Sequence, residues 1–145
     1  MSEGCFEMRL DHVVLHVADP LKSAEWFHDV VGLEPVRLEE FKRGESPFPS
    51  VRIAQDAIMD LSPLSSAEAL ERDTHASGSV GYRVNHVCIA MTREEYDALD
   101  ERLRADGRDT SARVRPTYGA RGWAPENFYF QDLDGNVIEA RYYED

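Results

Sequence analysis

Two histidines and two acids in matching positions are the residues of this sequence best suited to chemistry. His12 lies in "RLDHVVLHV" and His86 in "RVNHVCIAM", stretches that place histidine after Asp or Asn and then alternate apolar residues. Later in each half an acid alternates with apolar residues, Asp60 in "AIMDLSP" and Glu139 in "NVIEARYY". A carboxylate inside an apolar strand is costly unless it is paired, and a divalent cation is a partner that neutral imidazole can share. The set favours a divalent transition metal such as Zn, Ni, Mn or Fe.

The segment after the first histidine strand predicts a helix. In "ADPLKSAEWFHDVVGLE", Asp19 is placed to cap the helix, Pro20 suits its first turn, and Gly32 ends it. One face of this helix is apolar and carries Leu21, Ala24, Phe27 and Val31.

The segment after the second histidine strand predicts the same kind of element. In "TREEYDALDERLRADGRD", Thr92 and Glu95 form a capping box and Gly107 ends the helix. The apolar stripe consists of Tyr96, Leu99 and Leu103.

These matching elements predict an internal repeat. The histidines are 74 positions apart and the terminating glycines 75, so the offset hardly changes across strand and helix. Each half then continues into strand-like segments, "EPVRLEEF", "SVRIA" and "AIMDLSP" in the first and "ARVRPT", "NFYFQD" and "NVIEARYY" in the second. We therefore predict an α+β fold of two βαβββ modules in one domain, residues 1–75 with the start of a linker and residues 76–145. The linker, "SSAEALERDTHASGSVGYR", predicts a short helix and a Gly- and Ser-rich turn.

Alternation along the two first strands separates a core face from a second face. Val13, Leu15 and Val17 are expected to cover the helix, and this leaves His12 and His16 on the opposite face. In the second copy, the helix side is expected to hold Val87, Ile89 and Met91, and the histidine side His86, Cys88 and Ala90. The two histidines thus come to equivalent places.

The composition limits the classes of partner. The 145 residues carry 28 acidic and 16 basic side chains, a net charge of -12 that repels phosphate backbones and anionic membrane surfaces. We expect neither nucleic acid nor membrane as a partner. The sequence has no apolar run near the roughly 18 residues of a membrane span and no signal-peptide pattern at its start, so a cytoplasmic location is expected. Cys5 and Cys88 lie far apart and are both expected to be free thiols.

The sequence resembles the vicinal oxygen chelate superfamily, which includes glyoxalase I, extradiol dioxygenases, fosfomycin-resistance proteins, methylmalonyl-CoA epimerase and bleomycin-binding proteins. The resemblance is carried by "LDHVVLHVADPLKSAEWFHDVVGLE", "VNHVCIAM" and "NFYFQDLDGNVIEARYY". It implies that the modules form a curved, cup-shaped mixed sheet with helices outside, and that His12, His86 and Glu139 bind a divalent metal. It also implies a homodimer, in which the modules forming one cup come from one chain or from two.

Two further residues are candidates for catalysis. Asp60 stands where glyoxalases tend to place a fourth ligand, usually glutamate, and its shorter side chain suits a group bound through water or a base. His16, on the same face as His12, is expected to be either the acid or base or a hydrogen-bonded structural histidine.

Four residues are candidates for binding a small-molecule substrate. Arg52, in "SVRIA", should face the cup and either anchor an anionic substrate or pair with Asp60. Trp123 lies in "PTYGARGWAPENFYF", a composition typical of a mobile loop, and either closes on substrate or packs on a neighbouring subunit. Asn127 and Tyr129, in "NFYFQD", complete the set.

The favoured function is a metal-dependent, glyoxalase-like lyase or isomerase that chelates vicinal oxygens of a small substrate. One alternative is a metal-free protein that binds a drug or metabolite, as bleomycin-binding members do. The other is an extradiol-type dioxygenase, which the resemblance leaves open.

Overall fold

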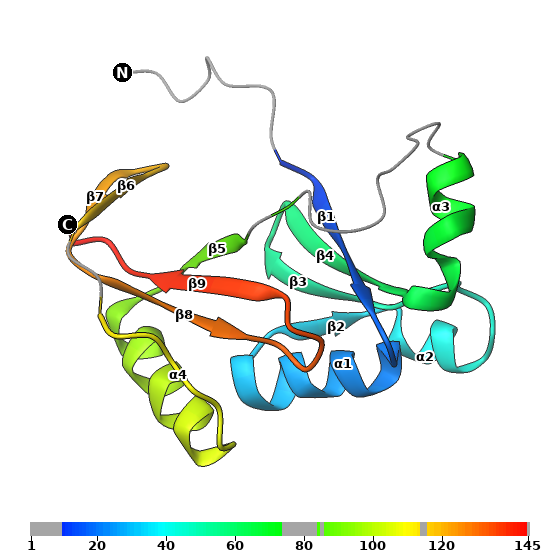
Figure 1. The fold of residues 1–145 in the computed structure, drawn as a ribbon, viewed down its shortest axis with the longest axis horizontal. Coiled ribbons are helices and arrows are strands. Elements are labelled where there is room, and N and C mark those ends of the chain that lie inside the picture. The colour runs from blue at the N-terminus through cyan, green and yellow to red at the C-terminus, as the bar shows by residue number, and fades with distance from the viewer. Residues whose placement is uncertain (1–9, 74–83, 85, 114–115, 145) are drawn as a thin grey trace.

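The two repeated halves of the chain form two separate sheets (Figure 1). The computed structural model describes residues 10–73, 84, 86–113 and 116–144. The first sheet has the order β1-β4-β3-β2 and consists of β1 (His12–Val17), β4 (Ala57–Pro63), β3 (Ser50–Ala54) and β2 (Glu34–Val36). The second has the order β5-β9-β8 and consists of β5 (Val87–Ala90), β9 (Val137–Arg141) and β8 (Asn127–Gln131). In both sheets the first strand of the module runs parallel to its last strand, which confirms the repeat.

The two helices predicted after the histidine strands begin and end where the sequence indicates. Asp19 accepts a hydrogen bond from the backbone of Lys22 at the start of α1 (Pro20–Trp26), and α1 continues as a π-helical turn, η2 (Phe27–Val31). Gly32, at φ 92°, then ends the helix in a conformation that costs glycine little. The remaining helices are α2 (Leu38–Lys42), the 3-10 turn η3 (Leu64–Ser66), α3 (Ala67–Asp73) and α4 (Arg93–Ala105). The predicted capping box of Thr92 and Glu95 starts α4.

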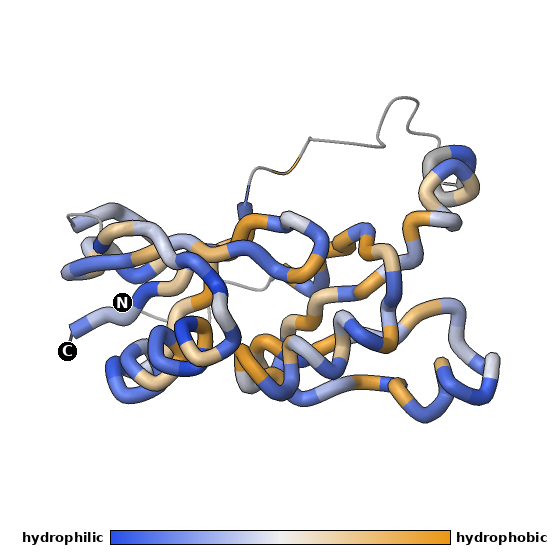
Figure 2. Tube along the Cα trace, turned by 60° about the horizontal axis from the view of Figure 1, so that its bottom comes forward, coloured by the Kyte–Doolittle hydropathy of each residue, from blue (hydrophilic) through white to orange (hydrophobic). Residues whose placement is uncertain are grey.

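One apolar core spans both halves of the chain. The predicted stripe on α4 is buried, as are Leu15, Val17 and Ile89 on the helix sides of β1 and β5. Trp26 of the first module packs against Phe130 of the second. The helices α1 and α4 lie on the same side of the sheets (Figure 1), and apolar stretches run through the middle of the molecule (Figure 2). The faces predicted to carry His12 and His86 therefore point away from this core.

Two strand predictions need correction. The strand expected over "EPVRLEEF" ends at Val36, because Arg37 adopts a left-handed conformation with φ 61° and the chain continues into α2. Residues 112, 113 and 116 of "ARVRPT" form no strand, and residues 114–115 lie outside the described residues. Among the described residues of that segment, only Thr117 belongs to a strand, as the first residue of β6 (Thr117–Gly119).

The segment expected to be a loop forms a hairpin instead. In the structure β6 pairs antiparallel with β7 (Gly122–Ala124), and Tyr118 lies opposite Trp123. This β6–β7 hairpin forms its own two-stranded sheet beside the C-terminus (Figure 1). The cross-strand aromatic contact between Tyr118 and Trp123, with ring centroids 5.3 Å apart, favours the extended conformation over an open loop.

The remaining predictions about the chain as a whole are tested only in part. Within the described residues, no helix combines the length and apolar character that crossing a membrane requires. The predicted module boundary at residues 75 and 76, and Cys5, lie outside the described residues.

Candidate metal centre

Strand register places a histidine and a carboxylate on the same face in each module. Asp60 of β4 lies opposite Val14 of β1, and Glu139 of β9 lies opposite Cys88 of β5. Residues in register share a face of the sheet, and so do residues two positions away along a strand. His12 and His86 therefore share a face with Asp60 and Glu139 respectively, as predicted.

In the first module, His12 is oriented by one acid and faces another. Its Nδ1 lies 2.7 Å from Asp11 Oδ2, and its Nε2 lies 3.9 Å from Asp60 Oδ2. The hydrogen bond that His12 donates to Asp11, followed by the charge of Asp60, raises the pKa of His12. Metal-binding histidines are commonly oriented in this way: a carboxylate accepts a hydrogen bond from one ring nitrogen, and the other ring nitrogen is left to face the metal position.

In the second module, His86 and Glu139 form a closer pair. His86 Nε2 lies 3.2 Å from Glu139 Oε1, and the ring of Tyr129 packs edge-on against His86 with centroids 5.4 Å apart. Ligand atoms at about 2.0–2.2 Å from a tetrahedral zinc ion are about 3.3–3.6 Å from each other. The 3.2 Å between His86 Nε2 and Glu139 Oε1 is close to the lower end of this range.

Both acids already have partners within the protein. Asp60 and Glu139 are buried, with 7% and 2% of their surface exposed. Ser50 donates a hydrogen bond of 2.7 Å to Asp60 Oδ1, and Arg141 donates two to Glu139 Oε2, at 2.7 and 3.2 Å. Glu139 therefore does not require an added cation, contrary to the expectation from the sequence, because Arg141 already neutralises it. In each acid one oxygen remains directed at its histidine.

The two pairs are not brought together within one chain. Among the residues that the structure describes, no three His, Cys, Asp or Glu side chains gather closely enough to hold one metal ion. His86 lies beside Glu139, and His12 lies beside Asp60 instead. Each pair fits as half of a site, while the full ligand set of His12, His86 and Glu139 is not assembled in one copy.

His16 lies at the far end of β1 from His12. Four residues along a strand span about 13 Å, so His16 is not beside a metal bound at His12 of the same chain. Its backbone oxygen accepts a hydrogen bond from the Asn136 amide, at 3.5 Å, and its buried Nδ1 has no hydrogen-bond partner among the described residues. The choice between an acid–base role and a structural role for His16 stays a prediction.

Arg52 and Trp123 are both exposed. Arg52 lies in register with Ile58 and so shares the face of Asp60, but its guanidinium donates to the backbone oxygens of Ala54 and Gln55 in the β3–β4 turn. The expected alternative of a pair between Arg52 and Asp60 is not formed. Trp123 is 67% exposed on the β6–β7 hairpin.

Asn127 and Tyr129 alternate along β8 and share the face of Glu139. Tyr129 is in register with Glu139, and Asn127 with Arg141. Asn127 is completely buried, its side-chain oxygen accepts a hydrogen bond from Thr117, and its Nδ2 has no hydrogen-bond partner among the described residues. Tyr129 therefore contacts the candidate ligand His86, whereas Asn127 lies in the protein interior.

Arg141 is the functional candidate that the sequence analysis missed. It lies two residues after Glu139, so strand alternation alone would have placed it on the same face. The same alternation correctly placed Cys88, an exposed free thiol beside Glu139. Desolvation, followed by the charge of Glu139, raises the pKa of Cys88 to about 11, which agrees with a lining residue and not a nucleophile.

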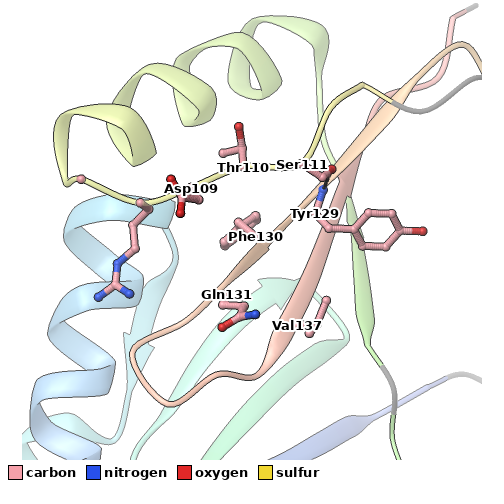
Figure 3. Close-up of a pocket in the computed structure, with 9 residues that line it drawn as sticks. Asp109, Thr110, Ser111, Tyr129, Phe130, Gln131 and Val137 are labelled. Atoms are coloured by element: carbon pink, nitrogen blue, oxygen red, sulfur yellow. Dashed lines mark hydrogen bonds between the residues drawn. The ribbon is translucent and has the colours of Figure 1, made fainter.

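A cavity lies along β8, the edge strand of the second sheet (Figure 3). It has a volume of about 480 Å³ between the segment after α4 and the β8–β9 hairpin. Its polar lining includes Asp109, Thr110 and Gln131. Tyr129 belongs to the lining, but its ring turns away from Asp109 and Thr110 (Figure 3), and it packs on His86. None of the residues that line the cavity is a candidate metal ligand.

Comparison with known proteins places this geometry in a family. The family model described as the Glyoxalase/Bleomycin resistance protein/Dioxygenase superfamily matches residues 9–140. No curated protein sequence matches the chain.

Solved structures share the fold at low sequence identity. An integron cassette protein from the mobile metagenome of V. cholerae is 23% identical with a TM-score of 0.66, and the match covers 94% of this chain and 96% of that one. Oxidase ChaP-H2 is 18% identical with a TM-score of 0.62, over 96% of each chain. A glyoxalase/dioxygenase from Nostoc punctiforme is 17% identical with a TM-score of 0.65, over 100% of this chain and 97% of that one.

Proposed function

The chain belongs to the glyoxalase/bleomycin resistance protein/dioxygenase superfamily, and we propose that it is a metal-dependent lyase or isomerase of the glyoxalase type. The observation that carries this proposal is the repetition of a histidine–carboxylate pair in equivalent strands, with His86 Nε2 only 3.2 Å from Glu139 Oε1. The substrate is a small molecule with two neighbouring oxygens.

The metal centre is proposed to form between two copies of the chain. Within one chain the two pairs stay apart, and each leaves a carboxylate oxygen and an imidazole nitrogen facing each other. A homodimer in which the first module of one copy faces the second module of its partner would unite His12 with His86 and Glu139. The proposal that a partner copy covers this face is supported by exposed apolar side chains close to the histidines in the sequence: Leu10, Val14 and Val84.

The chemistry follows from this ligand set. His12, His86 and Glu139 would hold a divalent ion, which when bound would supply polarisation of the substrate oxygens and stabilisation of negative charge on them. We propose that Asp60 accepts a proton from the substrate and returns it. Ser50 donates a hydrogen bond to Oδ1 of Asp60, and Oδ2 has no hydrogen-bond donor among the described residues. Asp11 holds Nδ1 of His12, which directs Nε2 toward the same space.

Metal analysis tests the proposal first. Protein purified without a nickel column should contain a stoichiometric divalent metal, and His86→Ala should lose it. An absence of metal in the wild-type protein, or full retention in the variant, would refute the metal-dependent function.

Mixing two defective variants tests whether the site is shared between copies. His12→Ala and His86→Ala are each expected to lose metal. After subunit exchange, half of the dimers are mixed and each mixed dimer regains one intact site, so about one quarter of the wild-type sites should return. A site built within one chain would recover none, because every chain carries one defect. A mixture of His86→Ala with Glu139→Gln is the matched control, because both changes affect the same module and no site is restored.

A metal-free binding protein is the second candidate function. The observation that favours it is the ion pair between Arg141 and Glu139, which satisfies the buried carboxylate without a metal. Thermal shifts of small ligands measured with and without a chelator separate the two candidates. A pure binding protein should respond equally in both conditions, whereas a metal enzyme should lose its response in chelator. Oxygen consumption is measured in parallel to test the remaining alternative, an extradiol-type dioxygenase, because the chain shares its fold with oxidase ChaP-H2.

A further inference from the structure

Arg141 is the most thoroughly fixed polar side chain near the candidate metal ligands. Only 6% of the residue is exposed, and all three guanidinium nitrogens make hydrogen bonds. Nε and Nη2 both donate to Glu139 Oε2, Nη2 also donates to Thr117 Oγ1 at 3.2 Å, and Nη1 donates to Tyr143 OH at 3.2 Å. These partners come from β9, from the β6–β7 hairpin and from the chain after β9.

The two donors to Glu139 select one of its oxygens. Both bonds from Arg141 reach Oε2, and neither reaches Oε1, which faces His86 Nε2. Withdrawing one partner from a buried ion pair is strongly destabilising, so Oε2 is not readily released to another cation. Glu139 therefore offers one oxygen, in one direction.

The first module lacks an equivalent of this cation. The residue two positions after Asp60 is Ser62, where the second module has Arg141 after Glu139. Asp60 is held by the neutral hydroxyl of Ser50 instead. The two halves thus differ in charge, and Glu139 is the acid whose charge is already balanced.

We propose that Arg141 is a positioning residue, which holds Oε2 of Glu139 so that a metal ion beside His86 is bound by Oε1 alone. This inference rests on the proposed metal-dependent function. It assigns to the β6–β7 hairpin a role in the metal site, because Thr117 anchors the same guanidinium nitrogen that holds Glu139.

Arg141→Lys is the test, because lysine keeps the buried charge and loses the planar fork of donors. The protein is titrated with Co²⁺, whose visible absorption reports the number and geometry of its ligands. We expect the dissociation constant to rise by about 10-fold or more and the absorption bands to weaken as Oε2 joins the metal. Tyr143→Phe is the matched control, because it removes a partner of Nη1 and leaves both bonds to Oε2 intact. Its Co²⁺ affinity and spectrum should remain close to those of the wild type.

The outcomes separate this inference from the proposed function. If the wild type binds Co²⁺ and Arg141→Lys binds it with the same affinity and spectrum, the positioning role is refuted and the metal function stands. If the wild type binds no metal, both are refuted. Thr117→Val provides a milder change, should Arg141→Lys not fold, and is expected to shift the spectrum in the same direction by a smaller amount. An unchanged spectrum in Thr117→Val would then overturn the positioning role.

Discussion

Replacing Asp132 by alanine should destabilise the turn between β8 and β9, through which the second module contacts the first. Asp132 is 2% exposed and accepts three hydrogen bonds, from the backbone of Asp134 at 2.9 Å, the backbone of Asn136 at 2.8 Å and the Asn136 amide at 2.9 Å. This turn contacts β1 directly, because the Asp134 carboxylate accepts a bond from the backbone of Ala18 and the Asn136 amide donates to His16. Asp132 thus shapes the contact between modules.

The size of the effect follows from these bonds. Three hydrogen bonds with a net value of about 1 kcal/mol each would give about 3 kcal/mol. Burial, opposed by the bonds from Asn136 and Asp134, raises the pKa of Asp132, so the folded protein penalises its charge and removal recovers part of the loss. We therefore expect Asp132→Ala to lower the free energy of unfolding by about 2–3 kcal/mol, or the melting temperature by about 5–10 °C.

Urea unfolding followed by circular dichroism measures this difference. Asp134→Ala is the matched control, because it removes only the exposed bond to Ala18 and should cost about 0.5–1 kcal/mol. If Asp132→Ala cost no more than Asp134→Ala, with an unchanged dependence on urea, the buried carboxylate would not be what holds the turn, and the reasoning would be wrong.

Two further predictions concern pH. Because the folded-state pKa of Asp132 is raised above its unfolded value of 3.8, the folded state binds more protons between the two pKa values, and this contribution to stability falls as pH rises. The stability of the wild type relative to Asp132→Asn should therefore be greater near pH 4 than at pH 7, and urea unfolding that gives a constant difference would contradict this. Cys88, whose pKa is raised from 9.0 to about 11, should contain about 100-fold less thiolate at pH 7.5 than an ordinary cysteine. Alkylation by iodoacetamide in Cys5→Ser protein with chelator present, followed by mass spectrometry, should accelerate up to about pH 11, and a plateau near pH 9 would argue against a raised pKa for this thiol.

The sequence predicted those parts of the fold that depend on local patterns. Helix caps at Asp19 and Thr92 require only short-range hydrogen bonds, and alternation in β1 and β5 reports which face is buried. The strand over "EPVRLEEF" was predicted too long because its residue types tolerate either conformation and the left-handed Arg37 leaves no clear mark in sequence. The β6–β7 hairpin was predicted to be a loop because glycines are common both in loops and in the turns of hairpins.

The candidate site was predictable within each module and not between them. Strand alternation was enough to put His86 with Glu139 and His12 with Asp60, because each pair lies on neighbouring strands of one sheet. The distance between the two pairs depends on how the sheets pack, which no local pattern encodes. The hydrogen-bond partners of the two acids were also missed. Ser50 and Arg141 are common residue types, and whether each reaches its acid depends on the side-chain rotamer, which the sequence does not reveal.

The repeat therefore explains where the candidate ligands lie, and the departures from it bear on what each half does. A duplicated module begins with two equivalent histidine–carboxylate pairs, and nothing in its backbone distinguishes them. Here the distinction comes from the partners of the acids, a neutral hydroxyl at Asp60 and a guanidinium at Glu139. A carboxylate held by a hydroxyl keeps its net charge and can accept a proton, while one neutralised by arginine is better suited to hold a fixed position. The asymmetry favours Asp60 as the group that moves a proton and Glu139 as the ligand.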